Sequence, residues 1–368
     1  MRDRRSTTRG ALTGLGLAGL AVGFYLPVAI WIGGGWGGVS STPDLGAMVT
    51  VSLTTLGVAV GAALVSVLLG SSVAVVATAF PIPFGSLWFA LSLVPLLLPD
   101  VVITTVAQAV VGGGPFEFFA RGVLGAVLLT GWKFAPLALW GIRLQLGALP
   151  LAERDALALV APRNALLVLA RRAIPSAVTT GALITALAFT RLEISEFAGV
   201  ETVAVRLLGA FQALENDAEG WVLASIATLI ALPLVLWFAR RASVDSIPAR
   251  GLSAAPLFRS SKPGLALWVL VVAQWIPLVV LGRVAFSTPI QPGELELITT
   301  DLLRESGRAA LVAAMIVAVG YRVAGWIRPA GLFWIAIPLF VPGAVTGLAN
   351  KAWESWAPFT ILNPEWQA

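Results

Sequence analysis

The stretch TVSLTTLGVAVGAALVSVLLGSSVAVVATA, residues 50–79, is a long run of uncharged and mostly apolar residues. A helix needs about 20 predominantly apolar residues to cross the hydrocarbon core of a bilayer. Because this run is longer than that, we predict a transmembrane helix that tilts or extends beyond the bilayer. Its glycines are compatible with this prediction, since glycine is common inside membrane helices.

The composition of the whole chain agrees with a membrane protein. The 368 residues are 58% hydrophobic and only 12% charged, with a mean hydropathy of +0.90. Soluble domains are about 45–50% apolar and about 25% charged. Cysteine and histidine are both absent. Their absence excludes disulfides, thiol chemistry, the usual zinc sites and histidine-based acid–base catalysis, and we predict no cofactor.

Similar apolar runs recur along the sequence, and we predict an all-α polytopic membrane protein with about nine transmembrane helices. The predicted spans are 11–32, 50–79, 86–111, 122–142, 176–198, 219–239, 265–287, 309–327 and 330–350. The first run follows the basic sequence MRDRRSTTRG, so a signal peptide is the alternative. We favour an uncleaved span, because the run is long for a signal peptide and WIGGGWGG is a poor cleavage site.

Lysine and arginine are distributed unevenly between the segments that join these spans. With the N-terminus in the cytoplasm, 16 of them fall on the cytoplasmic side and 5 on the outer side. This positive-inside bias predicts a multi-pass protein of the inner (plasma) membrane with a cytoplasmic N-terminus, in contact with lipid. The pI of about 10.4 therefore reflects topology, and we predict no nucleic-acid partner.

The sequence also predicts two membrane units. Residues 243–263 are polar and rich in serine, proline and arginine, which is typical of a linker between a first unit, 1–242, and a partial second unit, 264–368. Two motifs recur about 250 residues apart. They are PLLLP at 95–99 with PLFVP at 338–342, and FYLPVAIW at 24–31 with QWIPLVVL at 274–281.

A charged segment, LPLAERDALALVAPRNALLVLARRAIP at 149–175, interrupts the apolar pattern on the predicted cytoplasmic side. Pro150 can begin a helix with acidic residues in its first turn, and Pro162 ends that run. Asn164 can cap a second short helix, which Pro175 ends. One interpretation is an amphipathic loop on the lipid surface, and the other is a docking element for a soluble partner.

This segment resembles the cytoplasmic coupling loop, or EAA loop, of ABC importer permeases. Asp155-Ala156-Leu157 stands where that family has Glu-Ala-Ala, Ala161 stands at the turn glycine, and Ala173-Ile174-Pro175 closes the motif. The acid is aspartate instead of glutamate, the glycine is missing, and the spacing to Pro175 is one residue longer. The residues that the resemblance implies in coupling to an ATPase are Glu153, Asp155, Ala156, Leu157, Ala161, Pro162, Arg163 and Pro175.

The flanking sequences resemble the same family over about residues 10–242, and more weakly over 264–350. The layout is similar to fused permeases that serve ferric iron and similar small ions, with six spans in each of two copies. The implied partners are a cytoplasmic ABC ATPase dimer, an extracytoplasmic solute-binding protein and a second permease half, from a homodimer or a partner chain. A second coupling loop is expected near position 400, whereas the sequence ends at 368. Either the permease is truncated or split, or the count of nine spans is wrong. No G-x-x-x-x-G-K-[ST] motif occurs, so we predict no ATP hydrolysis by the chain itself.

Ionisable residues inside the predicted spans are candidates for a translocation path, because charge in a membrane is costly. They are Asp100, Lys133, Glu193 and Glu196, with Asp100 predicted to pair with Lys133. The alternative is that they lie near span ends and reach the interface. Rival functions remain open: an ATPase-independent transporter or channel, a membrane enzyme, or a truncated non-transporting subunit.

Overall fold

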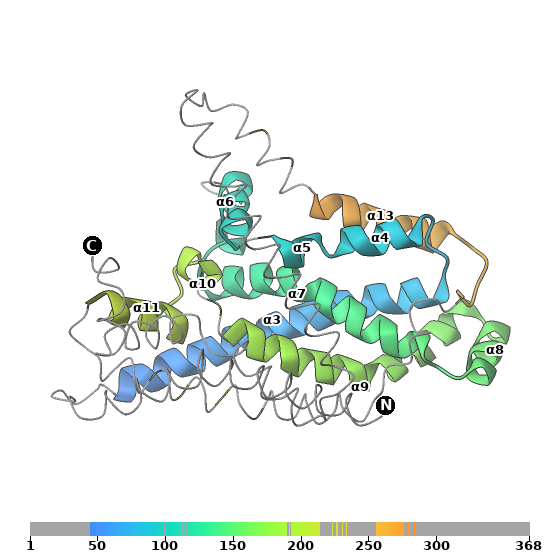
Figure 1. Ribbon diagram of the computed structural model, residues 1–368, viewed down its shortest axis with the longest axis horizontal. Helices are drawn as coiled ribbons and strands as arrows, with labels where there is room; N and C mark the ends of the chain where they lie inside the picture. Colours follow the sequence, from blue (N-terminus) through green and yellow to red (C-terminus); the bar gives the residue numbers. More distant parts are fainter. Residues whose placement is uncertain are drawn as a thin grey trace, which may run out of the picture.

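The computed structural model describes residues 45–98, 100–111, 114, 117–189, 191, 193–213 and 255–275, and singly 223, 226, 230, 233, 279 and 283. Every secondary-structure element in this part of the chain is helical (Figure 1). The elements are α3 (Leu45–Ala79), α4 (Gly85–Ser92), α5 (Val94–Leu97), α6 (Asp100–Val111), the 3-10 helix η2 (Glu117–Phe119), α7 (Gly122–Gly147), α8 (Leu151–Leu159), α9 (Pro162–Phe189), α10 (Glu193–Phe197), α11 (Val203–Ala213) and α13 (Lys262–Gln274).

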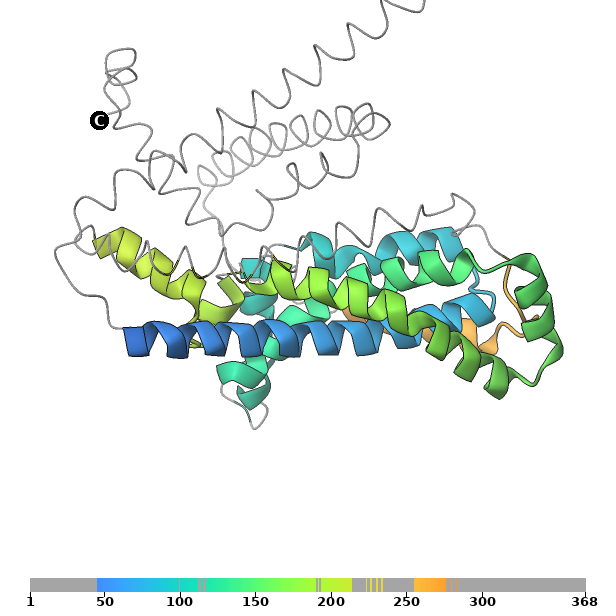
Figure 2. The same ribbon diagram turned by 90° about the horizontal axis from the view of Figure 1, so that it is seen from below.

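Three long helices form the centre of the molecule. The central helix, α3, packs along both α7 and α9, and these two also contact each other (Figures 1 and 2). Each of the three is long and apolar enough to cross a membrane, which indicates a membrane protein. With 35 residues, α3 extends over about 50 Å, so it exceeds a hydrocarbon core of about 30 Å, as its sequence predicts.

Small residues allow α3 and α7 to approach closely. A Cβ placed on Gly70 would lie 2.6 Å from the Cβ of Ala138, and one placed on Gly131 would lie 2.7 Å from the Cβ of Val65. The hydroxyl of Ser66 donates to the carbonyl oxygen of Gly131 at 2.7 Å. Lipid tails remove most of the hydrophobic drive for helix association, so close packing and such hydrogen bonds hold membrane helices together.

The span predicted over 86–111 is broken in the structure. The axes of 85–97 and 102–108 meet at 84°, so the pair forms either a broken span or a re-entrant loop. Leu98 has ψ 132°, an extended conformation, because the ring of the following proline disfavours helical geometry at this position. The break at 98–100 places the N-terminus of α6 inside the helix bundle.

The prediction of two short helices followed by a separate span over 176–198 is wrong. Only α8 is short, and α9 runs without interruption from Pro162 to Phe189. Pro175 lies inside α9 instead of ending it. A proline inside a water-exposed helix costs about 3 kcal/mol relative to alanine. Here buried residues on both sides of it, including Leu169 and Ile184, hold the helix in place against α3 and α7.

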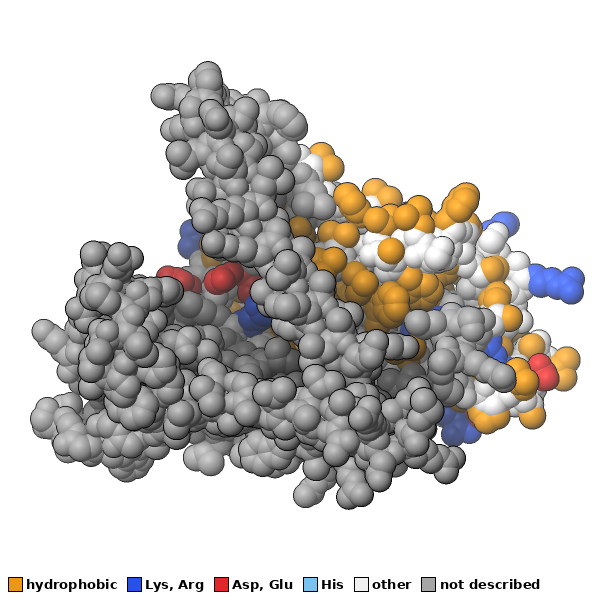
Figure 3. Space-filling model, in the orientation of Figure 1, with side chains coloured by type: hydrophobic (Ala, Val, Ile, Leu, Met, Phe, Trp, Pro, Cys, Tyr) orange, Lys and Arg blue, Asp and Glu red, His pale blue; other side chains and the backbone are white. Residues whose placement is uncertain are grey.

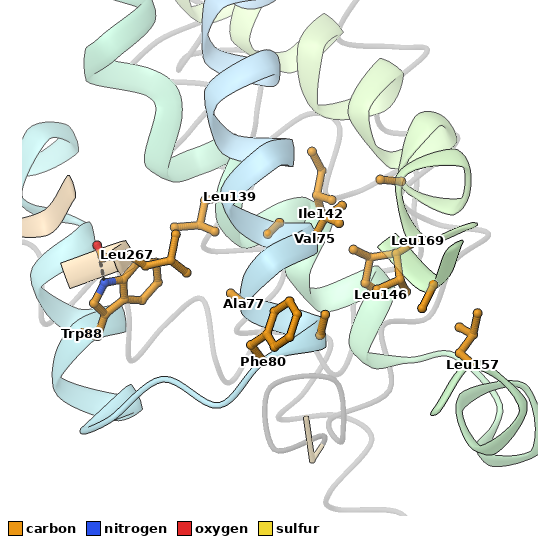
Figure 4. Close-up of a cluster of buried hydrophobic side chains, with 14 of the residues drawn as sticks. Val75, Ala77, Phe80, Trp88, Leu139, Ile142, Leu146, Leu157, Leu169 and Leu267 are labelled. Atoms are coloured by element: carbon orange, nitrogen blue, oxygen red, sulfur yellow. Dashed lines mark hydrogen bonds between the residues drawn. The ribbon is translucent and has the colours of Figure 1, made fainter. Parts of the chain in front are cut away.

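A buried apolar cluster closes one end of the bundle, where α3 and α7 end and α4 and α9 begin (Figure 4). Side chains from α3, α4, α7, α8, α9 and α13 meet there. The indole Nε1 of Trp88 donates to the carbonyl oxygen of Leu267 at 3.0 Å, and the backbone N–H of Phe258 donates to Ala79 O at 2.9 Å. Residues 255–275 are thereby tied to the α3–α4 end of the bundle.

Several predictions fall on parts of the chain outside the described residues. These are the spans 11–32, 309–327 and 330–350, nearly all of 219–239, and most of 265–287 beyond Trp275. The described residues contain three membrane-crossing helices, or four if the bent pair counts as one span. The count of nine spans, the partial second copy and both repeated motifs therefore stay predictions.

Candidate functional site

A buried ion pair lies at the break between α5 and α6. Lys133 in the middle of α7 pairs with Asp100, the first residue of α6, as the sequence predicts. The two side chains are only 4% and 2% exposed. The ammonium group of Lys133 also donates to the carbonyl oxygen of Leu98 at 3.0 Å.

The helix break explains why these charges are there. Ending a helix leaves backbone carbonyls without intrahelical partners, and no water satisfies them inside a membrane. Lys133 supplies a donor to the Leu98 carbonyl on one side of the break. Asp100 lies at the N-terminus of α6, where the helix dipole favours a negative charge. Lys133 therefore donates a hydrogen bond to Leu98, on the α5 side of the break, and neutralises the charge of Asp100, the first residue of α6.

A third charged side chain, Arg191, lies beside this pair. The guanidinium group of Arg191 lies 3.5 Å from the second carboxylate oxygen of Asp100 and is stacked over the Phe134 ring, 5.8 Å from its centroid. Arg191 follows the end of α9, and its side chain is 44% exposed. Arg191 and Asp100 are 91 residues apart in the sequence, and no local pattern indicates that they come close together. Their contact could therefore not be predicted from the sequence.

The two glutamates of the predicted path lie apart from the buried cluster. Both Glu193 and Glu196 are on α10, which packs against α6 and α7. Their side chains are exposed, while Ile194 and Ser195 between them are buried. Among the described residues neither glutamate joins the ion pairs of Asp100, so their part in a translocation path stays a prediction.

The segment 149–175 has a buried side and an exposed side. Leu157 packs into the apolar cluster at the end of the bundle, and Arg154 is also buried. Glu153 pairs with Arg172 across the angle between α8 and α9, at 2.9 Å. The remaining predicted coupling residues are exposed: Asp155, Ala156, Ala161, Pro162, Arg163 and Pro175.

The exposed side of α8 also carries large apolar side chains. Leu159 is 89% exposed and Leu151 is exposed as well. The helix lies at the end of the bundle (Figure 2), and charged side chains of both signs gather at that end of the molecule (Figure 3). This combination of apolar and charged groups is typical of a surface that contacts another molecule.

A separate cavity of about 580 Å³ lies between α3, α4, α6, α7 and α13. Its lining is almost entirely apolar and includes Trp88, Ile103, Trp132 and Val271. It provides no charged group that would hold an ion. Within the described residues, no group of three or more acidic, histidine or cysteine side chains is arranged to hold a metal ion.

Comparison with known proteins adds no relative: no protein-family model, no curated protein and no solved structure matches the chain. The case for a function therefore depends on the geometry described above and on the resemblance of 149–175 to a coupling loop.

Proposed function

We propose that the chain is a transmembrane permease subunit of an ABC importer and that its α8–α9 segment docks on a cytoplasmic ATPase. The main support for this proposal is that α9 is one uninterrupted helix. One helix extends from Pro162, beside α8, to Phe189, two residues before Arg191. A movement of the start of α9, next to α8, is therefore carried along one continuous helix as far as Phe189.

The mechanism follows from this connection. Closure of the ATPase subunits on ATP pulls α8, which transmits the movement to α9 through the apolar cluster that Leu157 joins and, more weakly, through the Glu153–Arg172 pair. As α9 shifts, Arg191 moves relative to Asp100. The balance of charges around Asp100 then changes, and the break between α5 and α6 provides a point about which α6 moves. Such shifts of packed helices are an established means of switching between two states.

The cargo of this importer is a small ion such as ferric iron, delivered at the outer face by a solute-binding protein. A second permease half, from another copy or a partner chain, supplies the other wall of the path and the second ATPase contact. The chain itself contributes the buried Asp100–Lys133 pair and the partly exposed Arg191 as charged groups along the path.

The test is a pair of matched substitutions at the same end of the bundle. Leu159→Lys places a charge on the exposed side of α8, whereas Phe84→Lys does so in the exposed turn between α3 and α4. We expect Leu159→Lys to weaken co-purification with the ATPase by about tenfold or more and to abolish ATP-dependent uptake. Phe84→Lys should leave both unchanged.

An ATPase-independent transporter is the second candidate, because buried charge inside a membrane bundle also suits ion translocation without a motor. It predicts that uptake survives Leu159→Lys. It also predicts that Lys133→Met stops uptake. Uptake that persists in Leu159→Lys would therefore refute the importer and favour the transporter.

A further inference from the structure

Two buried arginines lie near the end of the bundle where α7 meets α8, apart from the ion cluster at the helix break. Arg143, in the last turns of α7, is 5% exposed, and Arg154 on α8 is 8% exposed. Arginines near a span end normally extend their guanidinium groups into water. These two do not, and they are close enough for their charges to repel each other.

The surroundings of these arginines leave hydrogen-bond donors unused. Nη1 of Arg143 donates to the Thr78 hydroxyl at 3.1 Å, and Nη2 of Arg154 donates to the carbonyl oxygen of Ala255. In contrast, Nε of Arg143 and Nη1 of Arg154 are buried and have no hydrogen-bond partner among the described residues. The indole Nε1 of Trp140, one turn from Arg143, is a third buried donor in the same condition.

The ring of Phe89 contacts both Trp140 and Arg143, so their unused donors lie in the same region. Phe89 stacks edge-on against Trp140, with ring centroids 5.5 Å apart, and the Arg143 guanidinium lies 5.8 Å from the centroid of the same ring. Trp140 and Arg143 are three residues apart and therefore share a face of α7.

The charge of the site is not neutralised by the described residues. Among the described residues neither Arg143 nor Arg154 forms an ion pair. Of the two acids that flank Arg154 in the sequence, Glu153 pairs with Arg172 and Asp155 has an exposed side chain. Burial lowers the pKa of Arg154 from its ordinary value, and the Asp155 charge opposes this shift. Buried charge is strongly destabilising unless it is paired, and an unmade hydrogen bond adds to the cost.

We propose that Arg143 and Arg154 form a binding site for a phosphate-class anion, supplied either by a phospholipid headgroup or by free phosphate. Guanidinium groups are strong donors to phosphate oxygens, and each of these two arginines has one buried donor left unused. The anion would join the end of α7, α8 and the segment that contains Ala255, and so hold α8 against the bundle. This site does not depend on an ATPase or on the proposed transport.

The experiment uses the full chain in phosphatidylcholine nanodiscs. Its unfolding temperature is measured against sodium phosphate, with sodium chloride of equal ionic strength as the control. A parallel arm adds phosphatidic acid to the nanodiscs, and native mass spectrometry counts the lipid that stays bound. A saturable rise with free phosphate assigns the site to the soluble anion, and retention of phosphatidic acid alone assigns it to a headgroup. Either result supports the proposal.

Two variants locate the site. Arg154→Gln removes one guanidinium group and should weaken phosphate or phosphatidic acid binding by about tenfold or more. Arg171→Gln removes the same charge from an exposed position on α9 and should leave binding unchanged. If Arg154→Gln does not fold, Arg154→Lys is used in its place. This variant keeps the positive charge but loses the guanidinium group. The comparison of phosphate with chloride on the wild-type chain is a second measurement that needs no variant.

Two outcomes would overturn the proposal. One is a wild-type chain that phosphate stabilises no more than chloride does and that retains no more phosphatidic acid than phosphatidylcholine. The other is a loss of binding in Arg171→Gln as large as in Arg154→Gln, which would indicate general attraction of anions to a basic surface.

Discussion

The replacement of Lys133 by methionine tests the buried ion pair at the helix break most sharply. Methionine keeps most of the volume of the lysine stem but removes the ammonium group. The change leaves the Asp100 carboxylate, 2% exposed, without its nearest cation, and it leaves the Leu98 carbonyl without the donor at 3.0 Å. Arg191 stays at 3.5 Å from the carboxylate and compensates in part.

The expected magnitude follows from burial. Removal of one partner of a buried pair costs about 3–5 kcal/mol, because the other charge stays buried and unpaired. With Arg191 as partial compensation we expect a loss of about 3 kcal/mol in the free energy of unfolding. In the Glu153–Arg172 pair, at 2.9 Å, the arginine side chain is 59% exposed, so Arg172→Gln should cost below about 1 kcal/mol.

Unfolding in mixed micelles, followed by loss of helical circular dichroism as SDS is raised, measures both variants on one scale. A double-mutant cycle with Asp100→Asn then isolates the coupling between the two side chains. We expect the double variant Asp100→Asn/Lys133→Met to lose less free energy of unfolding than the two single variants lose in sum. The reason is that the double variant buries no unpaired charge. Losses that are additive, or a Lys133→Met variant no less stable than Arg172→Gln, would refute the reasoning.

Four further changes test the packing. Gly70→Leu should destabilise the chain by about 2 kcal/mol or more in the same assay, because even a Cβ atom at this position would lie 2.6 Å from the backbone of α7. In contrast, a Cβ atom at Gly57 meets nothing within 4 Å, so Gly57→Ala should stabilise the chain by about 0.5–1 kcal/mol. Trp88→Phe removes the hydrogen bond to Leu267 and should raise hydrogen exchange in α13 while costing about 1–3 kcal/mol. Pro175→Ala should keep or raise stability, because α9 is already continuous there; a loss above about 1 kcal/mol would contradict this.

The apolar pattern predicted the long helices, because the length of an uninterrupted apolar run determines whether it can form a membrane-crossing helix without reference to distant residues. The runs 50–79 and 122–142 correspond to α3 and α7, each extended by a few residues. The pairing of Asp100 with Lys133 was also predictable and is confirmed, since two opposite charges in neighbouring spans have few other partners.

The features that sequence reasoning missed depend on contacts between distant segments. Pro175 was expected to end a helix, but packing against α3 and α7 outweighs the local penalty of proline. The approach of Arg191 to Asp100 depends on where α9 ends, and that boundary was predicted near 198 instead of at Phe189. The burial of Arg143 and Arg154 is equally invisible, because both positions look like ordinary cytoplasmic basic residues.

The proposed function requires α8 to be a cytoplasmic docking element for an ABC ATPase. A photo-crosslinking side chain at Leu159, introduced into the chain in living cells, tests this contact. We predict an adduct with an ATP-binding cassette ATPase, whose yield changes between the ATP-bound and nucleotide-free states. Adducts with lipid alone, or labelling of this position by a membrane-impermeant reagent added outside the cell, would contradict it.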